Sequence, residues 1–207
     1  MQITLYIPLN LWYNNYIMNI FVLDNDPVKA AQLQCDKHVV KMIVESAQML
    51  STTHRMLDGT EMKKPSKSGK TMVKYYELPD EREDILYKSV HFNHPCTVWT
   101  RESCCNYSWH YEHFIALCDE YKYRYGKTHS TDSKLRDILS KIPTNINRNG
   151  GMTMFKLAMK ASPECVVHGL GGTDAVESYR NFYQTKQARF SMVWTKRKIP
   201  EWFNANI

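Results

Sequence analysis

CDKHVVKMIVESAQML, residues 35–50, is the stretch that decides the fold of this chain, and its pattern continues to about residue 55. At about 100° per residue, the side chains divide between two faces of one helix. The apolar face holds Val39, Val40, Ile43, Ala47 and Leu50, with Met42, Val44 and Met49 at its margins. The opposite face holds His38, Lys41, Glu45, Gln48, Thr52 and Arg55, at spacings of three and four residues. The stretch therefore predicts a long amphipathic helix.

The polar face of this helix has two interpretations. It is either the solvated side of an ordinary surface helix, or the floor of an active site that brings an imidazole, an amine and a carboxylate into line. The rest of the chain has to distinguish between them.

Most of the remaining sequence also predicts helices. Asp26 and Pro27 suit the N-cap and the first residue of a short helix that precedes the long one. Further helices are predicted at residues 79–88, 96–125 with Gly126 as its C-cap, 129–141, 155–159 and 173–194. Asn19–Leu23 favours a strand, and the lysine-rich residues 60–74 favour a flexible loop. We predict a mainly α fold, a compact single-domain helical bundle over residues 18–207 with at most a short N-terminal strand element.

Composition restricts the chemistry that this bundle can perform. The net charge of +6 over 207 residues is compatible with phosphate-bearing partners. The six cysteines form no C-x-x-C pair and have no matching histidine spacing, so we predict reduced thiols and no metal site. No apolar run is long enough to span a bilayer.

Residues 1–17 differ from the rest of the chain. They contain apolar residues but no charged residue, and they lack the basic start of a signal peptide. The next methionine, Met18, opens the strand-like run. We interpret Met18 as the natural start and residues 1–17 as a non-native or flexible leader.

His38, Lys41 and Glu45 can meet at one small group, because residues i, i+3 and i+7 lie on one side of a helix. An amine beside a carboxylate suits imine chemistry, in which the amine attacks a carbon and the carboxylate moves protons. Other chemistries lack their residues. There is no G-x-S-x-G elbow, and Ser68-Gly69-Lys70-Thr71 is not a phosphate-binding loop because Lys64 stands in place of its first glycine.

Three short runs of the sequence match one known family. They are Asp36-Lys37-His38-Val39 with Glu45 seven residues after the histidine, Asn93-His94-Pro95 before a long helix, and Pro200-Glu201-Trp202-Phe203 near the C-terminus. On these runs the chain from Met18 onward resembles the phage and bacterial pyrimidine-dimer DNA glycosylases of the endonuclease V type.

The resemblance implies a compact all-helical domain and a specific reaction. The amine at the mature N-terminus would attack deoxyribose C1′, displace the damaged pyrimidine and form an imine, after which β-elimination would cut the strand. Glu45 would orient or protonate the sugar, and His38 would line the pocket. The substrate would be duplex DNA with a modified or damaged pyrimidine, and no cofactor is implied. Candidate substrate-binding residues are Asn19, Gln48, Arg55, Asn93, His94, Trp99, Asn106 and Trp202.

The chain departs from this family at two points. Where the family has arginines beside and just after its glutamate, this chain has Val44 and Gln48. The residue after Met18 is Asn19, which is large for a position that follows a removed methionine. The reacting amine is therefore left open between the N-terminal nitrogen and Lys41.

Two further functional classes fit the same residues. One is a non-catalytic helical protein that binds or sequesters a nucleotide or modified base. The other is a structural or interaction protein whose polar stripes are only solvated or interhelical. Our leading prediction is a DNA glycosylase and AP lyase with Glu45, His38 and Lys41 in catalysis. We expect it in the cytoplasm (the host cytoplasm if phage-encoded), with no membrane and no obligate protein partner.

Overall fold

The computed structural model describes residues 18–66 and 68–205, so the predicted leader at residues 1–17 lies outside the described residues. Its helices are α1 (Pro27–Gln32), α2 (Asp36–Asp58), α3 (Arg82–Ile85), α4 (Pro95–Glu102), α5 (Cys104–Tyr125), α6 (Ser130–Leu139) and α7 (Ala175–Gln184), with 3-10 turns η2 (Pro163–Cys165) and η3 (Thr185–Ala188). Two antiparallel hairpins pair β1 (Thr60–Pro65) with β2 (Met72–Glu77) and β3 (Val167–Gly169) with β4 (Gly172–Asp174). The predicted mainly α fold is confirmed.

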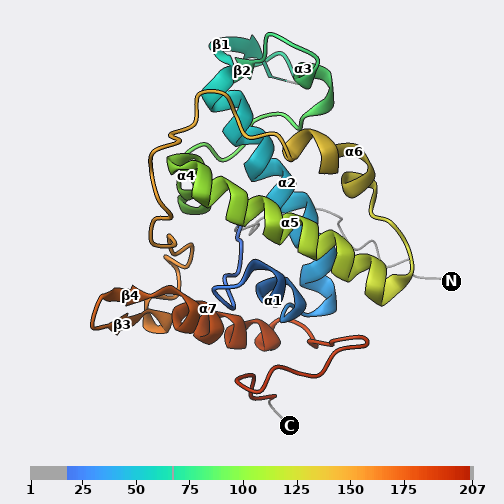
Figure 1. The fold of residues 1–207 in the computed structure, drawn as a ribbon, viewed down its shortest axis with the longest axis vertical. Coiled ribbons are helices and arrows are strands. Elements are labelled where there is room, and N and C mark those ends of the chain that lie inside the picture. The colour runs from blue at the N-terminus through green and yellow to red at the C-terminus, as the bar shows by residue number, and fades with distance from the viewer. Residues whose placement is uncertain (1–17, 67, 206–207) are drawn as a thin grey trace, which may run out of the picture.

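The two longest helices, α2 and α5, cross in the middle of the molecule (Figure 1). Helices α4 and α6 pack against both of them, and α1 packs on α5. The β1–β2 hairpin lies at one end of the molecule, where α2 ends, and α7 with the β3–β4 hairpin lies at the opposite end (Figure 1). Helix α2 contacts α4, α5, α6 and both strands of the β1–β2 hairpin, so it is the central helix of the fold.

Helix α2 is more buried than an amphipathic helix at a surface. The division into polar and apolar faces is wrong, since Val40 is 37% exposed whereas Glu45 is only 5% exposed. From Met49 to Arg55 every residue is buried. The reason is that segments far away in the sequence cover the polar face and supply partners for its side chains, which no helical period can report.

Asn19–Leu23 is not a strand, which corrects the prediction for this run. Phe21 has a φ of 52°, in the left-handed region, where a β-strand cannot continue. The backbone of the segment is instead bound by side chains: Gln34 Nε2 donates to the Ile20 carbonyl at 3.2 Å, and Arg180 Nε donates to the Leu23 carbonyl at 3.0 Å. The residues are nevertheless almost completely buried.

The predicted helix over residues 96–125 is divided into α4 and α5 at Ser103. Ser103 has extended backbone angles, and its hydroxyl accepts from the Asn106 amide at 3.2 Å, which starts α5 with an N-cap. The end of α5 at Gly126 is as predicted, with a φ of 67° that suits glycine. The N-cap at Asp26 and the first helical residue at Pro27 are also confirmed.

Three local predictions differ from the structure. Residues 155–159 are not helical, because their backbone bonds to distant side chains: the Ala158 amide donates to the Tyr179 hydroxyl at 3.1 Å. Helix α7 starts after Asp174 and ends at Gln184, well before residue 194. The lysine-rich residues 60–74 form most of the β1–β2 hairpin, in which the Lys64–Glu77 and Lys74–Glu61 pairs bridge the strands.

No helix in the described part of the chain is both long enough and apolar enough to cross a membrane.

Candidate active site

Glu45 is the centre of a buried cluster on α2. Its Oε2 accepts a hydrogen bond from the backbone nitrogen of Asn19 at 3.0 Å, and its Oε1 lies 3.0 Å from Lys41 Nζ. The side chain of Lys41 is 39% exposed, whereas that of Glu45 is 7% exposed. The cluster thus has a carboxylate inside, a backbone nitrogen on one oxygen, and an amine at the surface on the other.

Asn19 is held in place by its own side chain. Its Oδ1 accepts from the Phe21 amide at 3.0 Å, and its Nδ2 donates to the Ala158 carbonyl at 3.2 Å. This tight turn coincides with the left-handed φ of Phe21, a strained conformation that the surrounding structure has to maintain. The strain and the two hydrogen bonds aim the Asn19 nitrogen at Glu45.

Met18 is fixed next to this turn by His94, the N-cap residue of α4. His94 Nδ1 accepts from the Cys96 amide at 3.3 Å, and a hydrogen bond to the Met18 backbone favours the protonated ring. The pKa of His94 is nevertheless lowered, first by burial and then by the charge of His91. His94 therefore positions the chain beside Glu45.

His38 lies two turns before Glu45 on α2 and is neutral. Burial lowers its pKa to about 3, and the positive charges of Lys41 and Lys186 act in the same direction. The Tyr183 hydroxyl accepts from the Cys35 amide at 2.8 Å and lies 2.7 Å from His38 Nδ1. When the hydroxyl donates its own hydrogen to Nδ1, the ring proton lies on Nε2, and this is the tautomer that we infer for His38.

The pKa of Glu45 is raised, with burial as the largest cause. The charge and hydrogen bond of Lys41 and the backbone N–H of Asn19 oppose this shift. A carboxyl group whose pKa is raised toward neutrality can both accept and return a proton, which is the property that general acid–base catalysis requires.

Two pockets adjoin at this cluster and share Lys41. One, of about 480 Å³, is lined by Met18, Val40, Lys41, Val44, Glu45, Gln48, His91 and His129. The other, of about 220 Å³, is lined by Asn19, Phe21, Lys37, His38, Lys41, Phe182, Lys186, Arg189 and Phe190. A larger cavity, of about 630 Å³, lies elsewhere, between α1, α5 and α6, and contains none of the predicted site residues.

The structure brings six of the predicted site residues together: Asn19, His38, Lys41, Glu45, Gln48 and His94. Asn93 is exposed in the turn before α4 and lines neither pocket. Trp202 lines neither pocket, and the centre of its ring lies 6.1 Å from that of Tyr183, the residue that contacts His38.

Three predicted binding residues lie in the interior instead. Arg55, at the far end of α2, donates to the Tyr76, Glu83, Leu86 and Tyr87 carbonyls and pairs with the Glu83 carboxylate. Trp99 and Asn106 form a polar seam, in which Asn106 Nδ2 donates to the Trp99 carbonyl at 2.8 Å. All three side chains are at most 1% exposed, so they hold the fold together.

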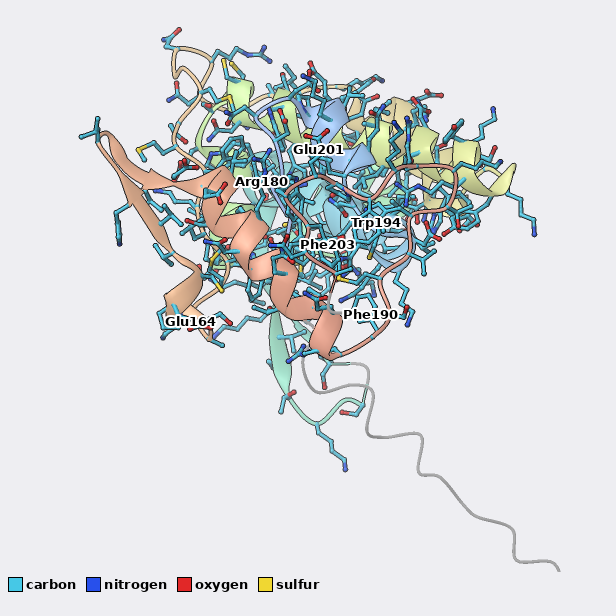
Figure 2. All side chains as sticks on the ribbon, turned by 90° about the horizontal axis from the view of Figure 1, so that it is seen from below. Glu164, Arg180, Phe190, Trp194, Glu201 and Phe203 are labelled. Carbon is cyan, nitrogen blue, oxygen red and sulfur yellow. The ribbon has the colours of Figure 1, made fainter. Side chains whose placement is uncertain are left out.

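Several residues of the two pockets were missed at the level of sequence: Met18, Phe21, Lys37, His91, His129, Phe182, Lys186, Arg189 and Phe190. Tyr183, which contacts His38 and lines neither pocket, was also missed. Lys37 carried a signal, since it lies inside the Asp36-Lys37-His38 run. The residues of α7 and η3 carried no such signal. They are about 140 residues or more from their partners in the sequence, as in the Tyr183–His38 contact, and only tertiary folding brings them together. Figure 2 views this end of the molecule, with Phe190 beyond the end of α7.

Among the described residues, no group of three or more histidine, cysteine or carboxylate side chains is arranged to hold a metal ion. The six cysteines are free thiols.

Comparison with known proteins identifies the family. No curated protein and no solved structure matches the chain. The family model described as pyrimidine dimer DNA glycosylase matches residues 18–133, more than half of the chain, from Met18 to Ser133 in the first half of α6. This range contains Glu45, Asn19, Lys41 and His94. The chain therefore belongs to the pyrimidine dimer DNA glycosylase family, and it is a DNA glycosylase that acts in DNA repair.

Proposed function

We propose that the chain removes a damaged pyrimidine from duplex DNA by an amine–imine mechanism and then cuts the strand as an AP lyase, with Glu45 as the group that transfers protons. The observation that carries this proposal is the 3.0 Å contact between the Asn19 nitrogen and Glu45 Oε2. The contact is buried and supported from three sides, by Ala158, Phe21 and His94.

The Asn19 nitrogen is our first candidate for the nucleophile. In a chain whose first residue is Asn19, this nitrogen is a free amine, and the carboxylate of Glu45 can accept its proton. The nitrogen would then attack deoxyribose C1′, and the bond from C1′ to the base would break, with its electron pair leaving on the base. Met18 lines the same pocket as Glu45, so its removal would leave room for the sugar at the place where the amine points.

The later steps use the same carboxyl group. In the C1′ adduct, the bond from C1′ to O4′ breaks and O4′ takes up a proton, while the electron pair of the nitrogen forms the protonated C1′=N imine. Loss of a C2′ proton then expels the 3′ phosphate and cuts the strand. Water hydrolyses the imine and restores the amine. The raised pKa of Glu45 supports its exchange of protons in both directions through these steps.

Lys41 is the second candidate amine and also a partner of the carboxylate. Its Nζ lies 3.0 Å from Glu45 Oε1, in an i,i+4 ion pair at the mouth of both pockets. We propose that Lys41 holds the carboxylate in position, whereas the Asn19 nitrogen reacts.

Trapping with borohydride tests the mechanism and identifies the amine. Protein beginning at Met18, and protein processed to begin at Asn19, would be incubated with an abasic duplex and with a dimer-containing duplex. We expect a reduced covalent adduct with the processed protein, and peptide mass mapping should place it on the peptide that begins with Asn19. Lys41→Arg, which keeps the charge but cannot form an imine, should still give the adduct.

Two results would contradict parts of this proposal. An adduct that maps to Lys41 and disappears in Lys41→Arg would transfer the nucleophile to that lysine. The absence of an adduct in every form would rule out imine chemistry.

We further propose that residues 18–207 act as one helical domain and that residues 1–17 are a leader outside it. Six free thiols and a DNA substrate favour a reducing compartment that contains DNA, such as the cytoplasm of a bacterium or of a phage host.

A further inference from the structure

The pocket of about 220 Å³ beside Asn19 has an unusual charge. Its lining includes the cations Lys37, Lys41, Lys186 and Arg189, and no aspartate or glutamate is among its described lining residues. Lys41 is paired with Glu45 in the neighbouring pocket. The other three cations thus face a space whose walls offer no carboxylate.

Aromatic rings, rather than carboxylates, support two of these cations. Lys37 Nζ lies 4.7 Å from the centre of the Phe190 ring, and Lys186 Nζ lies 3.3 Å from that of Phe182. Burial lowers the pKa of Lys186 to about 8, and the charges of Arg189 and Lys41 add to this effect. Burial and mutual repulsion make it unfavourable to hold these cations close together, so their presence indicates a site that binds an anion.

His38 adds a neutral hydrogen-bond donor to the same wall. Its ring stacks on Phe21 at 4.8 Å, and its Nδ1 is occupied by the Tyr183 hydroxyl. The remaining Nε2–H belongs to a residue that lines the pocket. A fixed N–H beside several cations is the arrangement that binds phosphate oxygens.

We propose that this pocket binds a phosphate of the damaged DNA strand, namely one of the two phosphates bonded to the deoxyribose that reacts at Glu45. The inference rests on the proposed function, which puts that sugar between Asn19 and Glu45. Asn19 and Lys41 line the pocket, and both also contact Glu45, so the pocket adjoins the place proposed for this sugar and its phosphates. Lys186 and Arg189 lie beyond the residues that match the family model, so this part of the site comes from the C-terminal third of the chain.

Neutral variants combined with a neutral backbone test the pocket. Lys186→Met and Arg189→Met would be compared with Lys141→Met, an exposed lysine after α6 that lines neither pocket. The probe is an abasic duplex in which the phosphate on the 5′ or the 3′ side of the abasic sugar is replaced by methylphosphonate. Dissociation constants for the full chain would be measured from low to moderate salt, and melting temperatures would confirm that each variant is folded.

We expect Lys186→Met and Arg189→Met each to weaken binding of the native duplex about tenfold, as for the loss of a hydrogen bond to a charged group. The slope of log Kd against log salt should fall by about one per lost contact. On the duplex with methylphosphonate at the contacted position, the same variants should lose little or nothing further. Lys141→Met should bind like the unmodified protein.

The pocket assignment is overturned if Lys186→Met and Arg189→Met bind like Lys141→Met. It is also overturned if their losses are the same with methylphosphonate at either position as with the native duplex. Neither result depends on adduct formation. A missing borohydride adduct with intact methylphosphonate effects would instead overturn the proposed mechanism and leave the phosphate pocket in place.

Discussion

At the scale of single residues, Glu45 is a buried carboxyl group whose partners do not offset the effect of burial on its pKa. It has two partners, one from the backbone of Asn19 and one from Lys41, and its pKa is raised despite both. A buried carboxylate that served only stability would gain from partners strong enough to lower its pKa. The balance at Glu45 suits proton transfer better than it suits stability.

Glu45→Gln should separate these two roles. An amide oxygen can still accept from the Asn19 nitrogen, so we expect the variant to fold with little change in melting temperature. Its rates of adduct formation and strand cleavage should fall by about 10²–10⁴-fold, the range for loss of a general acid or base. Glu61→Gln, in the exposed Lys74 pair of the hairpin, is the matched control and should be fully active.

The pH profile gives a second measurement on the same variant. Activity of the unmodified protein should rise with pH through a midpoint above the ordinary pKa of glutamate, about 4.3, because the raised pKa delays ionisation of Glu45. That limb of the profile should disappear in Glu45→Gln. Full activity of the variant across this pH range would exclude Glu45 from proton transfer.

At the scale of elements, α2 has a different task at each of its ends. Its first half carries the site, whereas its last turn anchors the β1–β2 hairpin and α3 through Arg55. That guanidinium makes bonds to four carbonyl groups and to Glu83, which also accepts from the Tyr75 hydroxyl and the Leu78 amide. One side chain thus satisfies the ends of two neighbouring elements.

Arg55→Met should therefore be strongly destabilising. It removes a buried cation and leaves its carboxylate and carbonyl partners without donors, and such a loss costs about 3–5 kcal/mol. Lys64→Met, which removes the exposed pair with Glu77, should change the free energy of unfolding little, because water screens the pair. Urea unfolding of both variants measures the difference. Equal effects would show that Arg55 is not the anchor of the hairpin.

The elements that the sequence predicts correctly are those with local signals. Asp26 and Pro27 start α1, Gly126 ends α5, and residues 36–58 form one continuous helix. The misassigned strand at Asn19–Leu23 and the misassigned helix at residues 155–159 bond to side chains far away in the chain, such as Arg180 and Tyr179. Local patterns contain no trace of such partners.

The site divides in the same way. His38, Lys41 and Glu45 lie on one helix, so their spacing indicated them. Arg55 shared that spacing but lies at the other end, where folding buries it. The cationic pocket needed α7, whose position against α2 becomes visible only in the structure.

At the scale of the whole molecule, the interior contains several neutral histidines. Burial lowers the pKa of His38 to about 3 and those of His54 and His113 to about 4, and it lowers the pKa of His110 well below its ordinary value. In the unfolded chain each ring titrates near 6.5. Below that pH the unfolded state binds more protons than the folded state, so acid favours unfolding.

We expect the free energy of unfolding to be highest above pH 6.5 and to fall steadily as the pH is lowered toward 4. Each of these histidines contributes up to about 1.4 kcal/mol per pH unit, and the raised pKa of Glu45 opposes them in part. Urea unfolding at a series of pH values measures the slope. His54→Gln should reduce it by about one proton, whereas the exposed His168→Gln should not change it. A slope near zero between pH 6.5 and 4.5 would contradict the assignment of neutral buried histidines.

The hydrogen bond from Asn19 to the Ala158 carbonyl, together with the contact of Tyr183 with His38, also sets a time order during synthesis on the ribosome. Asn19 emerges among the first residues, whereas Ala158 and Tyr183 emerge long after the segment that defines the family. The nascent chain can thus form α2 and present Glu45 early, but the Asn19 nitrogen and the His38 imidazole are fixed only after Ala158 and Tyr183 have left the ribosome. A truncated product, or one stalled near residue 133, would contain all the residues that match the family model and still lack a finished site.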